Sequence, residues 1–329
     1  MAVAPIHEFL MHAAYFAPRG QARLVELGSS LANRYLAPTD KLIGLIGDAG
    51  AGKSLLIRGM FPGLELTNDD CGINVRPLPL LRDAEQDHFR AHTYHIDLRF
   101  ETAFTQPWII AEAVRKAVME GRRVVLEHFD LIYSHLKINA EVLIGIGEEV
   151  IVTRPGIFGP EPQAIAEVVF ESLKFRKMAH SAEDLTGLVL AEMGITKPEV
   201  HSDIRHGFIL EFEERPDIDL VEVERQVLAH IARNEVIQYH NENNIRVGTQ
   251  IFGCTGPRLH VVRTGDISNF CLLKEFKWDP IAKLHIIVGL VGLSDYGEVL
   301  KGGPQDFWPL LDKLDRPPGC QAAENKEDK

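Results

Sequence analysis

One short run of the sequence carries the residue types that bind phosphate. It matches the pattern G-x-x-x-x-G-K-[ST] and consists of Gly47, Asp48, Ala49, Gly50, Ala51, Gly52, Lys53 and Ser54. The glycines let backbone N–H groups turn toward a β-phosphate, the Lys53 ammonium can reach the β and γ oxygens, and the Ser54 hydroxyl can bind Mg²⁺. An apolar strand at residues 42–46 precedes the run, and a helix is expected after it. This context favours a nucleotide-binding loop over a glycine-rich turn that binds nothing.

Two acidic residues follow predicted strands and are candidates for chemistry at the phosphate. Glu127 ends one apolar run, and Asp97 ends another. Because the carboxyl ends of parallel strands share one edge of a sheet, both carboxylates are expected beside the loop. Glu127, or Asp130 after it, can hold the water shell of Mg²⁺, and Asp97 can act as a base or bind substrate. Together with Lys53, Glu127 and Asp97 are the predicted catalytic residues; the alternative for each acid is a solvated strand end.

The surrounding pattern places the loop in an α/β domain. Strands are predicted at residues 42–46, 93–98, 123–127 and 149–153, and a helix at residues 107–120. Strands that alternate with helices predict a mainly parallel sheet covered on both faces. A run rich in proline and glycine, residues 154–162, predicts the end of this domain near residue 160. The nucleotide-binding domain is therefore expected over residues 39–160, after a helical N-terminal segment at 1–38.

Judged from the loop, its strand and the run from Val124 to Glu127, this domain resembles the uridine-kinase and related small-molecule kinase branch of the P-loop NTPases. The resemblance implies binding of a nucleoside triphosphate, ATP, with Mg²⁺, and transfer of its phosphoryl group. The N-K-x-D sequence that would favour guanine is absent, and so is an arginine-rich lid of the usual kind. The phosphate acceptor and the choice between ATP and GTP therefore stay open.

The C-terminal half carries a second motif. From Cys254 onward the chain contains His260-Val261 and then Thr264-Gly265-Asp266-Ile267, and His180 stands upstream at the start of a predicted helix. On these residues, the segment 175–280 resembles the editing domains that act on alanyl-tRNA and threonyl-tRNA. An α+β domain is expected over residues 161–315, with helices at 163–178, 182–193 and 220–237 and strands at 207–212, 246–252, 269–276 and 284–290. A tail at residues 316–329 has little to bury and is expected to be disordered.

The resemblance implies a zinc site formed by His180, Asp184, Cys254 and His260. Residues i and i+4 lie on one face of a helix, so His180 and Asp184 can reach the same ion, and zinc accepts nitrogen, oxygen and sulfur donors. The sequence departs from the family pattern twice. Asp184 replaces a second histidine, and two extra residues separate Cys254 from His260. The alternative is a site without metal, in which Cys254 is a buried small side chain and His180 a capping or surface residue.

The composition excludes several classes of protein. The chain has 329 residues, of which 45% are hydrophobic, and a net charge of −12. No run reaches the roughly 18 consecutive apolar residues needed to span a membrane, so no membrane partner is expected. Four cysteines without paired spacing favour thiols and a reducing, cytoplasmic location. The acidic charge argues against a broad nucleic-acid surface, so contact with tRNA is not favoured.

These observations lead to one main hypothesis and two alternatives. The chain is expected to be an ATP-dependent enzyme, a small-molecule kinase or an ATPase, whose editing-related domain recognises an amino-acid-like substrate or an aminoacyl group. An aminoacyl-tRNA deacylase regulated by the nucleotide-binding domain is the first alternative. A non-catalytic nucleotide switch that binds a partner protein is the second. The sequence does not fix the oligomeric state.

Overall fold

The structure is a computed structural model that describes residues 12–17, 20–67, 76–156, 159–195, 200–204 and 206–292. The chain divides into two units, Met1–Leu173 and Lys174–Lys329, which are described separately below as unit 1 and unit 2. This boundary lies beyond the predicted one near residue 160, because a long helix, α8 (Pro162–Glu192), continues from one unit into the next. The tail expected to be disordered, residues 316–329, lies outside the described residues.

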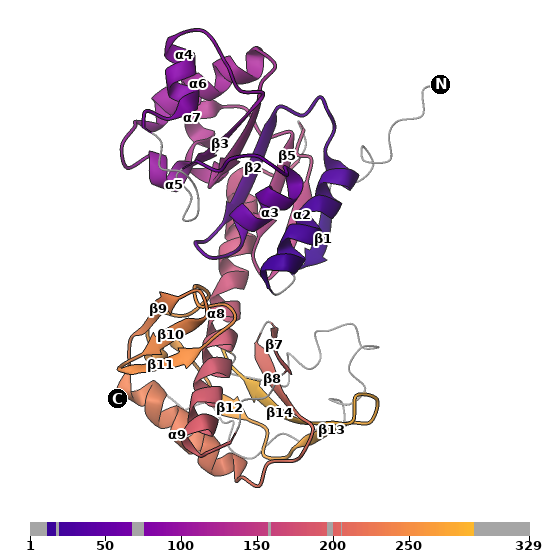
Figure 1. Cartoon of the computed structure of the whole chain (residues 1–329), viewed down its shortest axis with the longest axis vertical. Coiled ribbons are helices and arrows are strands. Elements are labelled where there is room, and N and C mark those ends of the chain that lie inside the picture. The colour runs from indigo at the N-terminus through magenta and orange to yellow at the C-terminus, as the bar shows by residue number, and fades with distance from the viewer. Residues whose placement is uncertain are drawn as a thin grey trace, which may run out of the picture. The chain divides into compact units, whose positions relative to one another are not determined.

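Unit 1 is built on a six-stranded sheet in the order β1-β6-β5-β2-β4-β3 (Figure 1). The strands are β1 (His12–Phe16), β2 (Leu42–Gly47), β3 (Thr93–Asp97), β4 (Arg123–Glu127), β5 (Val142–Ile146) and β6 (Glu149–Thr153). Neighbours within β5-β2-β4-β3 pair in parallel, whereas β6 and β1 are antiparallel additions at one edge. Every residue of β2 and β5 is buried, as expected for central strands covered on both faces.

The helices of unit 1 are α2 (Gln21–Tyr35), α3 (Lys53–Met60), α4 (Pro79–Glu85), α5 (Leu98–Glu101), α6 (Pro107–Met119) and α7 (Tyr133–Leu136), with a 3₁₀ turn η1 (Phe129–Leu131). Helices α2 and α3 lie side by side in front of the sheet (Figure 1). They cross where two glycines meet: a Cβ on Gly59 would lie 2.0 Å from the Val25 carbonyl oxygen, and one on Gly28 2.2 Å from the Leu56 carbonyl oxygen. This close crossing fixes the helix that follows the predicted phosphate-binding loop.

The N-terminal segment differs from the predicted helix. Its described part contains the strand β1 before α2. Tyr15 of β1 pairs with Val150 of β6 in an antiparallel register. The strand forms because it satisfies the backbone N–H and C=O groups that β6 would otherwise leave unpaired at the sheet edge. The prediction of a helical segment over residues 1–38 is therefore wrong for residues 12–16 and agrees with the structure over α2.

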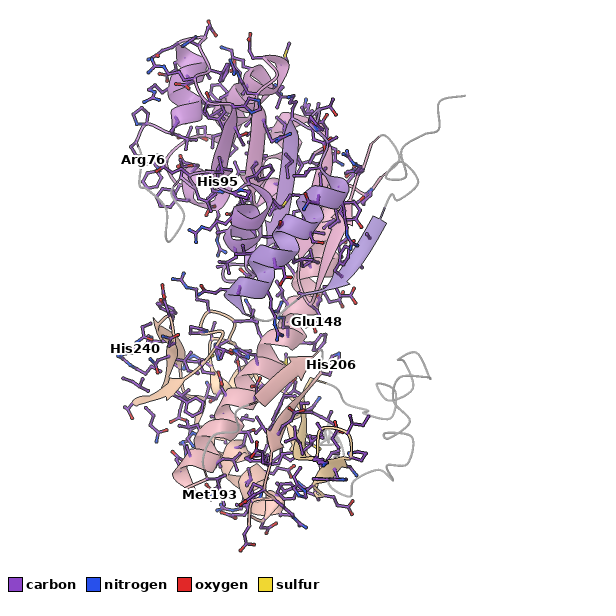
Figure 2. All side chains as sticks on the ribbon, turned by 45° about the vertical axis from the view of Figure 1, so that its right-hand side comes forward. Arg76, His95, Glu148, Met193, His206 and His240 are labelled. Atoms are coloured by element: carbon purple, nitrogen blue, oxygen red, sulfur yellow. The ribbon has the colours of Figure 1, made fainter. Side chains whose placement is uncertain are left out.

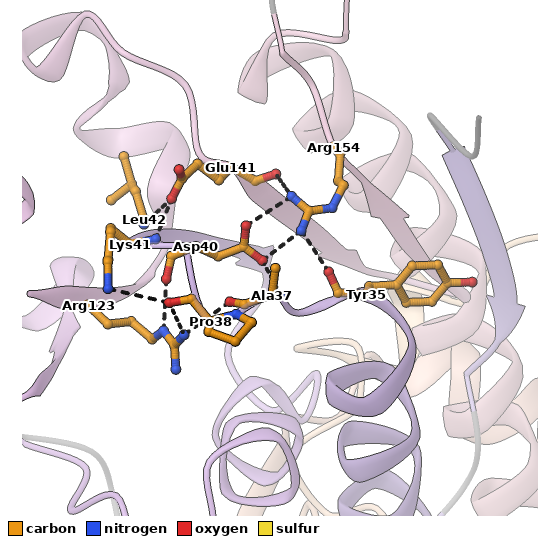
Figure 3. A network of polar contacts seen from close by, with 9 residues as sticks. All are labelled: Tyr35, Ala37, Pro38, Asp40, Lys41, Leu42, Arg123, Glu141 and Arg154. Carbon is orange, nitrogen blue, oxygen red and sulfur yellow. Dashed lines mark hydrogen bonds and ion pairs between the residues drawn. The ribbon is translucent and has the colours of Figure 1, made fainter. Parts of the chain in front are cut away.

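A network of charged side chains around the buried Asp40 holds the start of β2 (Figure 3). Asp40, 3% exposed, accepts two hydrogen bonds from the Arg154 guanidinium, at 3.0 Å to Oδ1 and 2.7 Å to Oδ2. Arg154 also donates to the Tyr35 carbonyl at 3.0 Å, and Arg123 donates to the Asp40 carbonyl at 2.9 Å. The network ties the end of α2 and two strands to the entry of β2, and so sets the direction in which β2 runs toward the loop.

We expect Asp40→Asn to lower the free energy of unfolding of unit 1 by about 3 kcal/mol, because a neutral amide leaves the Arg154 guanidinium without its counter-charge. Chemical denaturation followed by circular dichroism measures this change. The control is Asp87→Asn, which removes a carboxylate whose Oδ1 lies 3.4 Å from an exposed Lys116 ammonium. Equal midpoints for the two variants would contradict a stabilising role for the Asp40 network.

Unit 2 contains two antiparallel sheets packed with helices. One sheet has the order β12-β14-β8-β7 with β13 also paired to β14, and the other has the order β11-β10-β9. The strands are β7 (Val200–Ile204), β8 (Gly207–Phe212), β9 (Ile237–Asn241), β10 (Asn244–Val247), β11 (Gln250–Gly253), β12 (Cys271–Leu272), β13 (Lys277–Asp279) and β14 (Leu284–Leu290). The helices are α9 (Leu220–Arg233), the second half of α8 and the 3₁₀ turn η2 (Thr264–Asp266).

The core of unit 2 forms around the second half of α8. Residues 178–190 of this helix are all buried, and they pack with the alternate buried side chains of β8 and with the apolar face of α9. The sequence predicts two helices here, but no proline or glycine separates Met178 from Ala182, so α8 continues without a break. A fully buried helix places its polar side chains inside the domain, and these include His180 and Asp184.

Candidate functional site

The predicted phosphate-binding loop connects β2 to α3 in unit 1. Gly50 and Gly52 have φ of 78° and 95°, a left-handed region that glycine adopts without strain. A Cβ on Gly52 would also lie 2.6 Å from Leu24 Cδ1 of α2. No side chain caps the N-terminus of α3, and the first N–H groups of a helix have no partner within it. The loop thus presents backbone donors at the positive end of a helix dipole, an arrangement that suits an anion.

Two loop side chains converge on one carboxylate. Strand β4 lies beside β2 in parallel register, with Leu45 opposite Glu127. The Ser54 hydroxyl donates to Glu127 Oε1 at 3.1 Å, and Lys53 Nζ lies 3.7 Å from Glu127 Oε2. Lys53 Nζ also donates to the carbonyl oxygens of Gly47 and Asp48, at 3.1 and 2.9 Å. Lys53 and Glu127 are only 5% and 3% exposed, so water screens the attraction between their opposite charges only weakly.

His95 of β3, labelled in Figure 2, was not among the predicted site residues, and it orients this carboxylate. The Thr67 backbone N–H donates to His95 Nδ1 at 3.2 Å, so Nδ1 carries no proton. The proton of a neutral ring then sits on Nε2, which lies 3.2 Å from Glu127 Oε1 and donates to it. Burial raises the pKa of Glu127, but the His95 hydrogen bond and the Lys53 charge outweigh burial and hold that pKa below its ordinary value.

Asp97 and His128 lie at the same edge of the sheet. Asp97 is in register with Glu127 and caps α5 by accepting from the Phe100 N–H at 3.2 Å. Burial, and then the Glu127 charge, raise the pKa of Asp97. His128 has a left-handed backbone with φ of 58°, and burial and the Lys53 charge lower its pKa to about 4. Ligand atoms of Asp97, Glu127 and His128 all lie within 4.8 Å of one another. The structure therefore brings Lys53, Glu127 and Asp97 together.

Asp130, the alternative to Glu127, occupies a different position. It belongs to η1, and neither Ser54 nor Lys53 makes a described hydrogen bond with it. Its Oδ1 is buried without a hydrogen-bond partner among the described residues, and burial raises the pKa of this carboxyl. Glu127 is thus the carboxylate that contacts the loop.

In unit 2 the four predicted ligands converge, although they come from distant parts of the sequence. His180 and Asp184 lie on α8, Cys254 follows β11, and His260 lies before η2. Cys254 Sγ is 3.3 Å from His180 Nε2 and 3.8 Å from His260 Nε2. Asp184 Oδ2 is 3.0 Å from His260 Nε2 and 3.9 Å from His180 Nε2. One ligand atom from each residue therefore faces a common centre.

These separations fit a tetrahedral ion. Zinc bonds of about 2.0 Å to nitrogen or oxygen and about 2.3 Å to sulfur give tetrahedral edges of about 3.3 Å between nitrogen or oxygen donors and about 3.5 Å from these donors to sulfur. The four separations, 3.0 to 3.9 Å, differ from those edges by about 0.2 to 0.6 Å. Burial raises the pKa of Cys254 to about 11, so the thiol stays protonated unless a cation displaces its proton. Burial also raises the pKa of Asp184, but the hydrogen bond to His260 and the histidine charges outweigh it and lower this pKa to about 2.

Residues around the four ligands hold them in place, and the sequence motif did not indicate these residues. The Glu183 carboxylate, 2% exposed, places Oε2 3.5 Å from His180 Nδ1, which favours the tautomer that turns an unprotonated Nε2 toward the centre. The Val261 N–H donates to Ser181 Oγ at 3.0 Å and so ties the loop that carries His260 to α8. The Gly256 N–H donates to Cys254 Sγ at 3.2 Å. Glu183 stands one residue before a ligand, so only its burial identifies it.

Two further features concern the state of the cysteines and the character of the helices. Cys254 is a free thiol, whereas Cys271 is disulfide-bonded, so the expectation of four thiols is wrong for Cys271. Among the described residues, none of the helices combines the length and the apolar character that crossing a membrane requires.

Comparison with known proteins adds little to this geometry. No protein-family model and no curated protein matches the chain. Among solved structures, N-acetylornithine aminotransferase from Stenotrophomonas maltophilia K279a is similar at 10% identity over 80% of this chain and 76% of that one, with a TM-score of 0.24. Ornithine aminotransferase from Toxoplasma gondii ME49 is similar at 12% identity over 78% and 69%, with a TM-score of 0.21. Scores this low carry no argument about fold or function.

Proposed function

We propose that unit 1 binds ATP with Mg²⁺ and that the chain is an ATP-dependent enzyme, a small-molecule kinase or an ATPase. The observation that carries this proposal is the contact of Ser54 and Lys53, both from the loop, with the buried carboxylate of Glu127. A hydroxyl that binds Mg²⁺, a lysine for the terminal phosphates and a carboxylate beside them are the groups that phosphoryl transfer needs. They support the proposal because folding alone gives no reason to bury a lysine and a glutamate beside a glycine loop.

In the proposed reaction each side chain has one task. When phosphate binds, the Lys53 ammonium leaves the Gly47 and Asp48 carbonyls and donates to the phosphate oxygens. Ser54 and Glu127 would hold a magnesium ion, and the ion would supply positive charge to offset that of the phosphates. The acceptor oxygen forms a bond to the γ-phosphorus as the bond to the bridging oxygen breaks, and ADP leaves. Asp97 accepts the proton of the acceptor, a role that suits a carboxyl with a raised pKa.

For unit 2 we propose a zinc ion held by His180, Asp184, Cys254 and His260, in a domain that recognises an amino acid or an aminoacyl group. The fit of the four donor atoms to a tetrahedron supports the ion, and the resemblance of residues 175–280 to editing domains supports the ligand class. Zinc there would supply a positive charge and a fixed geometry. Because four protein ligands complete a tetrahedral shell, this donor set favours recognition or structure over hydrolysis.

An aminoacyl-tRNA deacylase regulated by unit 1 is the second candidate function. The observation in its favour is that the altered motif still brings its four donors together, so the site that editing domains use is not dispersed. The net charge of −12 weighs against it, because tRNA binding draws on lysine and arginine. A non-catalytic nucleotide switch would keep the loop but would not need Asp97 beside Glu127. For each of these functions we propose a cytoplasmic location.

Replacing Lys53 with alanine tests nucleotide binding. We expect Lys53→Ala to weaken ATP–Mg²⁺ binding by about 1.5 to 3 kcal/mol, because it removes a charge-assisted contact to phosphate. Isothermal titration calorimetry measures this loss. The matched control is Lys41→Ala, since Lys41 stands at the other end of β2 and its ammonium donates to the Pro38 carbonyl, at 3.4 Å. Equal affinity of wild type and Lys53→Ala would refute binding at this loop.

A further inference from the structure

The edge of the sheet beside the loop contains a group of donors that the proposed ATP chemistry does not fully use. Asp97 comes from the end of β3, Glu127 from the end of β4, and His128 from the residue after β4. Each offers one ligand atom, and these atoms lie within 4.8 Å of one another. Two carboxylates and an imidazole this close are a donor set for a divalent cation.

His128 adds an imidazole nitrogen to the two carboxylates of this group. It is 6% exposed, and one of its ring nitrogens lies within 4.8 Å of a carboxylate oxygen of Asp97 and of Glu127. An imidazole nitrogen this close to two carboxylates is a suitable ligand for a transition ion. Its backbone has φ of 58° and ψ of 46°, a left-handed conformation that residues other than glycine adopt uncommonly. This turn of the chain places the ring beside the two carboxylates.

The charged groups at this edge of the sheet have a net negative charge, which favours binding of a cation. Glu127 and Asp97 each contribute one negative charge when ionised, Lys53 contributes one positive charge, and a neutral His128 contributes none. The three charged groups therefore sum to −1. Lys53 lies nearer to Glu127 Oε2, and Oε1 is the oxygen that accepts from Ser54 and His95. A divalent cation between the two acids would offset the repulsion between their charges.

We propose that Asp97, Glu127 and His128 bind a divalent transition ion in the absence of nucleotide. Imidazole nitrogen favours transition ions over Mg²⁺, and two carboxylates accommodate Mn²⁺ well, so Mn²⁺ is the probe of choice. This site goes beyond the proposed function, because it needs neither ATP nor an acceptor. It would give unit 1 a metal preference that a site of hydroxyl and carboxylate oxygens lacks.

Electron paramagnetic resonance on the whole, nucleotide-free chain tests the site with Mn²⁺. We expect one bound Mn²⁺ that shows ¹⁴N hyperfine coupling from an imidazole. His128→Asn should remove that coupling and weaken binding by about tenfold or more, and asparagine tolerates the left-handed backbone. Asp97→Asn should also weaken binding, while an asparagine can still cap α5. Asp87→Asn, which removes a carboxylate from another residue with positive φ, 47°, should bind Mn²⁺ like the wild type.

Two results would overturn the proposal. One is a wild-type chain that binds no Mn²⁺ without nucleotide. The other is nitrogen-coupled Mn²⁺ whose affinity is the same in His128→Asn and Asp97→Asn, which would place the ion elsewhere, for example at the histidines of unit 2. Thermal melts of the variants show whether they are folded. Loss of ATP binding in Lys53→Ala has no bearing on this test, so failure of the metal site and failure of the proposed function can be distinguished.

Discussion

The chain purified without a histidine tag is expected to contain about one equivalent of zinc, and the double variant His180→Ala, Cys254→Ser less than about a tenth of that. The variant removes two donors that lie 3.3 Å apart, and the remaining Asp184 and His260 cannot complete a tetrahedral shell. Inductively coupled plasma mass spectrometry measures the metal. Because zinc binds the folded domain, chelation should also lower the unfolding temperature of the wild type but not of the variant.

The control for metal content is His240→Ala. His240 lies on β9 (Figure 2), is exposed and belongs to the same unit, so its loss tests for metal held by surface histidines. We expect this variant to keep its equivalent of zinc. A metal-free wild type with full activity would contradict the zinc proposal and leave unit 2 as a recognition surface.

The second large effect is expected from Glu127→Gln. Glutamine keeps the shape and can still accept hydrogen bonds from Ser54 and His95. It loses the negative charge that attracts the Lys53 ammonium and that would hold Mg²⁺. We expect turnover of ATP to fall by about 100-fold or more, while the affinity for ATP changes only a few-fold. Single-turnover kinetics and calorimetry on the same preparations separate the two quantities.

A glutamate directly before β5 provides the control for this prediction. Glu141 accepts from the Leu42 N–H at 3.0 Å at the amino end of β2, away from the loop. Glu141→Gln should leave turnover unchanged. If Glu127→Gln also shows wild-type turnover and affinity, the magnesium carboxylate would have to be Asp97 or Asp130.

The sequence predicted the elements of unit 1 that carry strong local patterns. The observed β4 and β6 have the predicted bounds, and β2 and β3 differ from prediction by one residue each. The sequence assigned no strand to β5, whose residues lie between the predicted strands at 123–127 and 149–153, and it also missed β1. Both depend on partners elsewhere in the chain: β5 pairs with β2, and β1 forms only against β6. Local periodicity does not contain such pairings.

In unit 2, too, some strands were predicted correctly and others were not. The strand β14 was predicted with its observed bounds, whereas the predicted strand at 246–252 is the hairpin of β10 and β11. Two residues, Gly248 and Thr249, turn the chain between them, and Gly248 has φ of 57°. A glycine in a strand-like run indicates such a turn as well as a bulge, so the pattern alone allowed both.

The candidate sites were predicted as far as motifs reach. The sequence indicated the loop and the four residues that converge in unit 2, because their residue types and spacing are specific. It did not indicate His95, His128 or Glu183. His95 acts across two strands, His128 depends on an unusual φ, and Glu183 depends on the burial of α8. Partners of this kind follow from tertiary packing and not from spacing.

One pair of incubations tests the central claim that this chain uses ATP. The purified protein is incubated with ATP–Mg²⁺ and, separately, with mischarged tRNA, and ADP and free amino acid are measured. The account predicts that ADP forms, that amino-acid-like compounds affect its rate, and that Lys53→Ala abolishes it, with no amino acid released from tRNA. Release of amino acid from tRNA without formation of ADP, unchanged in Lys53→Ala, would contradict the account and establish the deacylase instead.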